Sequence, residues 1–269
     1  MKHILLPTDF SDNAHHAIDY AVRMFGVEDA TFHIFYTFAI PVVTSEVSYA
    51  PIEHYEKEGT QRLQDEIAAL RTKYPDIQLA QHLEFGDIPT ALDKVQKEHD
   101  FYAVVMGTRG SSGLKQVFFG SNTYDLVDNT QLPVFVIPVD CDCHMPSNVV
   151  FACDLKPFKN DTVIEPLQNI VKTFDANLTI LNVKSDSDTF TMNQEMNHLD
   201  VLFENQDINV CFDDSDGVVE AIEGYSKEYP TDLVVALKRK KNFLQDLFGK
   251  SVTRDLTFHI HTPLLILHE

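Results

Sequence analysis

The sequence contains an internal repeat, in which four short segments recur in the same order. The segment HILLPTDFSDNA near the start corresponds to NVVFACDLKPFKND, which places Asp9 opposite Asp154. The later segments ATFHIFYTF, FYAVVMGTRG and LPVFVIP correspond to ANLTILNVK, TDLVVALKRK and TPLLILH. Each match is weak by itself, but four matches in one order indicate that a domain is present twice. We therefore expect two domains, at residues 1–140 and 147–269.

Within the first copy, short apolar runs alternate with segments of helical spacing. We expect strands at 4–7, 31–38, 78–85, 101–106 and 134–137, and helices at 13–25, 53–74, 89–97 and 123–129. This alternation predicts an α/β domain with a parallel sheet and helices on both faces. Ligands of such sheets bind beyond the carboxyl ends of the strands. Asp9 follows the first strand and Gly107 the fourth, so both reach one crevice if these strands are neighbours.

Composition and charge exclude several classes of partner. The 269 residues are enough for two domains, and no apolar run of 18 residues or signal peptide occurs, so we expect a cytoplasmic protein. The net charge is −20, with 10 Lys and Arg against 21 Asp and Glu up to His144, and 11 against 20 after it. Because both parts are acidic, neither nucleic acid nor a membrane is an expected partner.

Two small clusters allow a second interpretation. Cys141, Cys143 and His144 form the segment CDCH, which could hold a metal, although a second pair of ligands is lacking and a linker with two reduced thiols is the simpler interpretation. The basic run KRKK, at 238–241, is typical of a solvated loop but could meet a phosphate or an acidic partner.

The stretch MGTRGSSGLKQVFFGSNT contains the glycine pattern G-x2-G-x9-G-S, formed by Gly107, Gly110, Gly120 and Ser121. It lies between an expected strand and an expected helix, for which Ser121 and Asn122 offer capping side chains. Glycines permit a close approach to the backbone, and the first turn of a helix has unpaired N–H groups that suit an anion. A plain turn is the alternative interpretation of the glycines.

The repeat and this glycine pattern resemble the universal stress protein family in its tandem form. The resemblance covers essentially the whole chain, more strongly up to Pro138, and the glycine pattern is that of the ATP-binding branch of the family. It implies two doubly wound five-stranded parallel sheets of order 3-2-1-4-5, a fold similar to that of the adenine-nucleotide α-hydrolases. It also implies bound ATP, AMP or ADP, with Mg²⁺ or Mn²⁺ held through the phosphates.

The resemblance implies roles for individual residues. Asp9 would contact the adenosine, Thr37 would offer backbone groups to the adenine edge, and Gly107 would let the ribose approach. Arg109 would add a charge-assisted bond to a phosphate. The implied nucleotide-binding residues are Pro7, Thr8, Asp9, Thr37, Met106, Gly107, Thr108, Arg109, Gly110, Gly120, Ser121, Asn122 and Thr123.

Two of these roles have simpler alternatives, and the second copy lacks the pattern. Asp9 could only cap the following helix, and Arg109 could be an exposed side chain. In the second copy, Leu237 and Lys240 stand where Gly107 and Gly110 do, and their Cβ atoms would crowd a phosphate. We therefore expect one nucleotide site, in the first domain.

These observations favour a stress-response or regulatory protein that binds ATP and hydrolyses it slowly at most, since no general base is suitably spaced. We expect no catalytic residue and no metal ligand among the side chains. The last strands of the two domains could pair within the chain, and two chains could form a dimer. The alternatives are an adenylate-transferring or pyrophosphate-splitting enzyme that uses Lys115, and an interaction protein whose glycines serve packing alone.

Overall fold

The computed structural model divides into two compact units, Met1–Leu132 and Pro133–Glu269. It describes residues 1–39, 51–108, 120–142, 144–183, 189–203, 206, 208–215, 217–239 and 261–269. Both units are α/β, as the sequence predicted. Within these ranges, no helix has the length and apolar character needed to cross a membrane.

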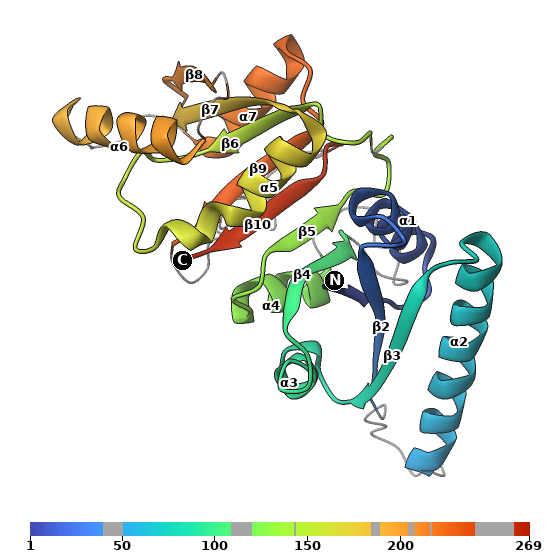
Figure 1. Cartoon of the computed structure of the whole chain (residues 1–269). Helices are drawn as coiled ribbons and strands as arrows, with labels where there is room; N and C mark the ends of the chain where they lie inside the picture. The colour runs from blue at the N-terminus through green and yellow to red at the C-terminus, as the bar shows by residue number, and fades with distance from the viewer. Residues whose placement is uncertain are drawn as a thin grey trace. The chain divides into compact units, whose positions relative to one another are not determined.

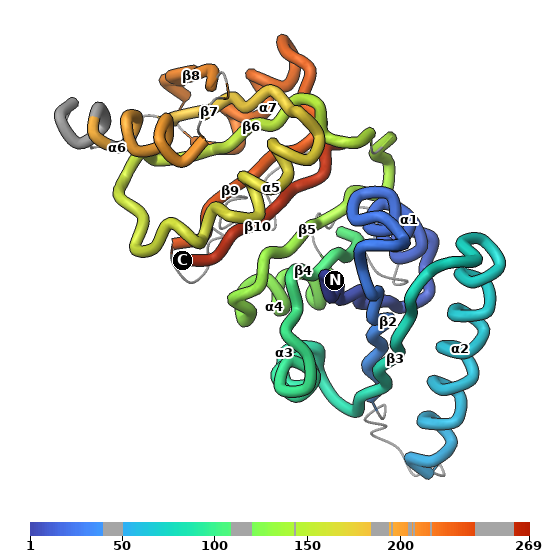
Figure 2. The backbone as a smooth tube through the Cα atoms, in the orientation of Figure 1, coloured from blue at the N-terminus to red at the C-terminus, as the bar shows by residue number. Residues whose placement is uncertain are grey.

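The described part of unit 1 has four strands and four helices that alternate along the chain (Figures 1 and 2). They are β1 (Lys2–Pro7), α1 (Asp12–Phe25), β2 (Ala30–Phe38), α2 (Ile52–Lys73), β3 (Gln78–Phe85), α3 (Ile88–Val95), β4 (Phe101–Gly107) and α4 (Ser121–Asn129). All pairings are parallel, in the order β3-β2-β1-β4. The expected elements of the first copy are confirmed, and their ends differ by at most two residues.

Unit 2 contains one strand from the first copy and the whole second copy. Its elements are β5 (Val134–Ile137), β6 (Asn148–Ala152), the 3-10 helix η1 (Asp161–Ile164), α5 (Glu165–Phe174), β7 (Asn177–Val183), α6 (Thr189–Leu202), β8 (Ile208–Asp213), α7 (Val218–Glu228), β9 (Leu233–Lys238) and β10 (Leu264–His268). The order β8-β7-β6-β9-β10 is parallel and is the predicted 3-2-1-4-5 order.

β5 belongs to the first copy of the repeat and groups with unit 2. It pairs antiparallel with β10, and the domain limits 1–140 and 147–269 stay a prediction. Val136 lies opposite Leu264, and Val134 lies opposite Ile266. All four residues of β5 are buried, so this apolar strand gains its stability from the neighbours that cover it.

The helices of unit 1 form because apolar residues recur at helical spacing. In α1, Ala14, Ala17, Ile18 and Ala21 are buried on one stripe, and Gly26 ends the helix with φ +74°. α1 packs on β1 and β4, whereas α2 packs on β2 and β3. Parallel connections that run in opposite directions along a sheet fall on opposite faces, so α1 and α2 cover one face, and α3 and α4 the other (Figure 1). The carboxyl ends of β1 and β4 are therefore left open between the two layers.

Candidate functional site

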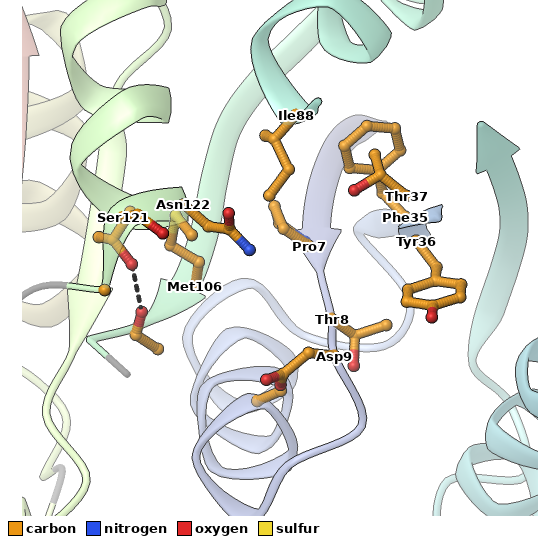
Figure 3. Close-up of a pocket in the computed structure, with 14 residues that line it drawn as sticks. Pro7, Thr8, Asp9, Phe35, Tyr36, Thr37, Ile88, Met106, Ser121 and Asn122 are labelled. Carbon is orange, nitrogen blue, oxygen red and sulfur yellow. Dashed lines mark hydrogen bonds between the residues drawn. The ribbon is translucent and has the colours of Figure 1, made fainter. Parts of the chain in front are cut away.

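A pocket lies in unit 1 at the carboxyl ends of β1, β2 and β4, next to the first turn of α4 (Figure 3). The space between its walls is about 690 Å³, part of which is open to solvent. The pocket is lined by Pro7, Thr8, Asp9, Ala14, Phe35, Tyr36, Thr37, Ile88, Met106, Gly107, Gly120, Ser121, Asn122 and Thr123.

A tight turn after β1 forms one wall. The Thr8 amide donates to the Phe35 carbonyl over 2.9 Å, and the Thr8 hydroxyl accepts from the Phe10 amide over 2.9 Å. Phe10 takes φ +65°, which a side-chain-bearing residue adopts at a cost of about 1–2 kcal/mol. These bonds hold the chain in a bend that leads into α1 and places Asp9 at the pocket wall.

Asp9 stabilises this turn rather than capping the helix. Its Oδ1 accepts from the Ser11 amide over 3.1 Å, which is a local Asp turn. The cap of α1 is Ser11, whose hydroxyl accepts from the Ala14 amide over 3.3 Å. The capping alternative for Asp9 is therefore wrong, whereas its contact with a nucleotide stays a prediction.

Arg62 on α2 lies beside this turn, and no sequence motif pointed to it. Its Nη2 donates to the Asp9 carbonyl over 3.5 Å, and its Cζ lies 4.2 Å from the centre of the Phe10 ring. The guanidinium also lies 5.7 Å from the ring centre of Tyr36, a lining residue. An exposed cation thus stands at the rim of the pocket in a protein whose net charge is −20. Only the fold brings it there, since 53 residues separate it from Asp9.

The described ends of the glycine loop are tied to each other. The Gly120 amide donates to the Thr108 carbonyl over 2.8 Å, and the Thr123 hydroxyl donates to the Gly107 carbonyl over 3.0 Å. The loop therefore leaves β4 and enters α4 at almost the same point. Arg109, Gly110 and Lys115 lie outside the described residues.

Gly107 has a packing reason of its own. A Cβ atom at this position would lie 2.6 Å from the Cγ and Oδ1 atoms of Asn13, which is closer than real Cβ contacts come. Asn13 is buried on α1, and the Thr108 hydroxyl donates to its Oδ1 over 3.4 Å. The close approach that requires glycine here is that of a neighbouring amide, a constraint that the sequence did not reveal.

The first turn of α4 faces the pocket. We expected Ser121 or Asn122 to cap this helix, but the helix begins at Ser121 and its N-cap is Gly120, with φ −60° and ψ 152°. Ser121, Asn122 and Thr123 are therefore the first three helical residues, and all three line the pocket. Backbone N–H groups at this end of a helix, together with the helix dipole, favour an anion.

The structure brings ten of the thirteen expected residues to this pocket. Thr108 is buried next to it, while Arg109 and Gly110 fall outside the described part of the chain. Four further lining residues were missed: Ala14, Phe35, Tyr36 and Ile88. Ile88 could have been found, because it starts the helix that follows β3 and so obeys the strand-end rule that pointed to Asp9.

Ile88 is held in place by a capped helix start. The Asp87 carboxylate accepts from the Thr90 amide over 2.9 Å and caps α3. Hydrogen bonding from Thr90 lowers the pKa of Asp87, so this cap is ionised at neutral pH. Ile88 therefore presents a fixed apolar side chain to the pocket, opposite the polar turn of α4 (Figure 3).

At the matching place in unit 2, Arg239 occupies the end of the sheet. Its Nε lies 3.4 Å from Asp154 Oδ1, and its Nη1 lies 2.9 Å from Glu269 Oε2. Its guanidinium also donates to the carbonyls of Lys156 and Pro157, each over 2.8 Å. Arg239 belongs to the basic run, whose expected role as a solvated loop is therefore wrong at this position; Lys240 lies outside the described residues.

Cys141 differs from the reduced thiol that we expected. It is buried and disulfide-bonded, whereas Cys153 and Cys211 are free thiols. Cys143 lies outside the described residues. Because a disulfide sulfur has no thiolate to offer, Cys141 in this state is not a metal ligand.

The whole chain is similar in fold to several solved structures. A universal stress protein from Archaeoglobus fulgidus DSM 4304 is 18% identical, with 98% of this chain and 97% of that chain covered at a TM-score of 0.73. A functionally unknown protein from Pseudomonas aeruginosa PAO1 is 11% identical, with 100% and 92% covered at a TM-score of 0.63. The cytoplasmic domain of a prokaryotic cation chloride cotransporter is 8% identical, with 99% and 95% covered at a TM-score of 0.60.

At these identities the solved structures establish the fold alone. A search of the curated proteins found no match. The model of the universal stress protein family matches residues 1–138, which is just over half of the 269 residues and includes every expected nucleotide-binding residue. The chain therefore belongs to the universal stress protein family.

Proposed function

We propose that this protein is a nucleotide-binding regulatory protein that holds one ATP in the pocket of unit 1. One observation carries the proposal: the turn after β1, the ends of β2 and β4, and the first turn of α4 converge on a single pocket. Its apolar part, with Ile88 and Met106, suits an adenosine, and the amides of α4 suit phosphates.

The lining residues also suggest positions for the adenine, the ribose and the phosphates of the nucleotide. Thr37, at the end of β2, offers backbone groups for the adenine edge, and Asp9 offers a carboxylate to the ribose hydroxyls. Ser121, Asn122 and Thr123 offer N–H groups and polar side chains to the phosphates. Mg²⁺ or Mn²⁺ would be held mainly by those phosphates. The rim cation Arg62 would offset the repulsion between an acidic protein and an anionic ligand.

The described lining residues support slow hydrolysis at most. Asp9 is the only carboxylate among the described lining residues, which include no lysine or histidine, and its Oδ1 accepts from the Ser11 amide. A lysine over the phosphates and a base placed for a water are the parts that fast phosphoryl transfer needs. Bound nucleotide would then act as a conformational signal in a cytoplasmic stress response.

The strand pairing supports an assembly role for the second copy. The antiparallel ladder between β5 and β10 joins the last strands of the two repeats, so we propose that domains 1–140 and 147–269 form a dimer-like pair within one chain. Two such chains would associate as a homodimer. Arg239 forms ion pairs with Asp154 and Glu269 at the strand end of the second copy. We therefore propose no nucleotide site in the second copy.

Ser121→Asp tests the proposal without removing the fold. A carboxylate in the first turn stabilises a helix through its dipole, yet it would repel a phosphate. We expect isothermal titration calorimetry with ATP and Mg²⁺ to show one site in the natural protein and none in Ser121→Asp. Ser121→Asn is the matched control, because it has nearly the same size and no charge, and it should retain binding. Equal affinity of all three proteins would rule out this pocket as the site.

A further inference from the structure

Four histidines gather on one face of the sheet of unit 1, away from the pocket. His3 lies near the start of β1, and His99 lies just before β4, whereas the pocket residues follow the strand ends. Pro7 lies four positions after His3 along the strand, which is roughly 13 Å at about 3.3 Å per residue. His33 on β2 and His82 on β3 complete the cluster.

The strand register explains why these side chains meet. His33 lies opposite Leu5 of β1 and Ala80 of β3, so it shares a face with the side chains two residues away on each neighbour, His3 and His82. The contacts are close: His3 Nδ1 lies 2.8 Å from His33 Nε2, and His33 Nδ1 lies 2.8 Å from His82 Nε2. The His99 ring lies 4.6 Å from the His33 ring, centre to centre.

We propose that His3, His33 and His99 bind a divalent transition metal ion of the Zn²⁺ class, with His82 as the partner that orients His33. Each of the three offers a ring nitrogen, and these nitrogens lie within 4.8 Å of one another. Zn–N bonds of about 2.0–2.1 Å in a tetrahedral site place the nitrogens about 3.3 Å apart, so modest ring rotations suffice. Three imidazoles leave one coordination position for water or another small ligand.

The bonds of His33 fit a metal ligand. With a proton on Nδ1, its ring donates to His82 Nε2, and the lone pair on Nε2 then faces His3 and the ion. A metal-ligating histidine almost always donates its second ring N–H to an acceptor, usually a carboxylate, a backbone carbonyl or water, which fixes its tautomer and direction. At His33 the acceptor would be His82 Nε2. His3 would ligate through Nδ1 and carry its proton on Nε2.

The surroundings of the cluster favour binding of a cation by neutral rings. His33 is buried, and this burial together with the nearby imidazoles lowers its pKa to about 3, so it is uncharged at neutral pH. Phe101 is buried against it, with ring centres 4.9 Å apart, which provides an apolar wall. His3 and His99 are half-buried and provide a path for the ion. An all-imidazole set selects Zn²⁺ and similar ions over Mg²⁺ and Ca²⁺, which prefer oxygen.

The test uses the untagged full-length protein, dialysed against EDTA and free of nucleotide, so that neither a tag nor a phosphate binds the ion. Titration with Co²⁺ is followed by its visible absorption, and Zn²⁺ is then added in competition. We expect the intense bands of four-coordinate Co²⁺ at one ion per chain, abolished by Zn²⁺ and unaffected by Mg²⁺.

Half-buried ligands are the variants of choice, because replacing His33 in the core could unfold the protein. We expect His3→Gln and His99→Gln to weaken Zn²⁺ binding by more than about 100-fold, and His82→Gln by about 10- to 100-fold, as for other orienting partners. His54→Gln, on the exposed face of α2, is the matched control and should bind as the natural protein does. The proposal is overturned if the folded natural protein shows no such bands, or if His3→Gln and His99→Gln bind Zn²⁺ unchanged.

Discussion

The turns that follow β1 and β6 have the same local structure and different surroundings. Asp9 accepts from the amide of Ser11, and Asp154 accepts from the amide of Lys156, in each case two residues further along. The next residue is left-handed in both, with φ +65° at Phe10 and +48° at Leu155. The repeat that was visible in the sequence is thus retained down to individual backbone angles.

The surroundings of the two turns differ. In unit 1 the turn lines a pocket, and Arg62 lies at its rim over Phe10. In unit 2, Arg239 reaches Asp154 and Glu269 and fixes the loop carbonyls of Lys156 and Pro157. The same fold can therefore have a pocket at the strand ends, or have these ends bound by an arginine of the chain itself. A few side chains determine which of the two is present.

Removal of the Arg239 side chain should cause the largest loss of stability, and this loss should fall on the strand ends of unit 2. The Glu269 side chain is only 3% exposed, so Arg239→Ala leaves a buried carboxylate without its main cation, at a cost of about 3 kcal/mol. Hydrogen exchange of peptides from β9 and β10 would measure the loss. Lys156→Ala, which removes an exposed partner of Asp154, is the control and should change exchange little. Equal increases in hydrogen exchange after the two substitutions would contradict the stabilising role of Arg239.

Addition of ATP should stabilise unit 1 and leave unit 2 unchanged. At a hundredfold excess over Kd, one site raises the free energy of unfolding by about 2.7 kcal/mol. Hydrogen exchange should therefore slow in peptides from β1, β4 and α4. Equal protection of β6 and β9 would mean that the second strand end also binds nucleotide.

Gly107→Ala should destabilise unit 1 through packing alone. The new methyl group would meet Asn13 at 2.6 Å, and such overpacking costs about 2 kcal/mol. Urea unfolding in the absence of nucleotide would measure the loss. In an Asn13→Ala background the same substitution should cost much less, because the clash is gone. A cost that does not depend on Asn13 would show that Gly107 is needed for another reason.

The smallest expected loss of stability comes from removing the side chains that cap the first helix of each copy. Ser11 caps the 14-residue helix α1, so Ser11→Ala should cost about 1 kcal/mol. Asn160 accepts from the Thr162 amide at the start of the four-residue helix η1, and Asn160→Ala should cost about 0.5 kcal/mol. Thermal unfolding of both variants would compare them, and a larger loss at Asn160 would contradict this ranking.

The sequence predicted the parts of this fold that depend on local patterns. Alternating apolar and helical segments identified the elements, and the strand-end rule placed Asp9 and Gly107 in one crevice. The sequence could not predict contacts between residues that are far apart along the chain and meet only when helices pack on the sheet. Arg62 reaches the pocket only because α2 crosses β2 and β3, and Asn13 explains Gly107 only once α1 lies on β4. Nor did any motif connect the four histidines, which the strand register brings together.

The most direct test of the account counts nucleotide in the folded protein. The protein is equilibrated with ATP and Mg²⁺ by dialysis and then denatured, and the released nucleotide is counted by mass spectrometry against protein concentration and the protein-free compartment. We expect about one adenine nucleotide per chain in the natural protein and in Arg239→Ala, and none in Ser121→Asp. Two nucleotides per chain, or a nucleotide that persists in Ser121→Asp, would contradict a single site in unit 1.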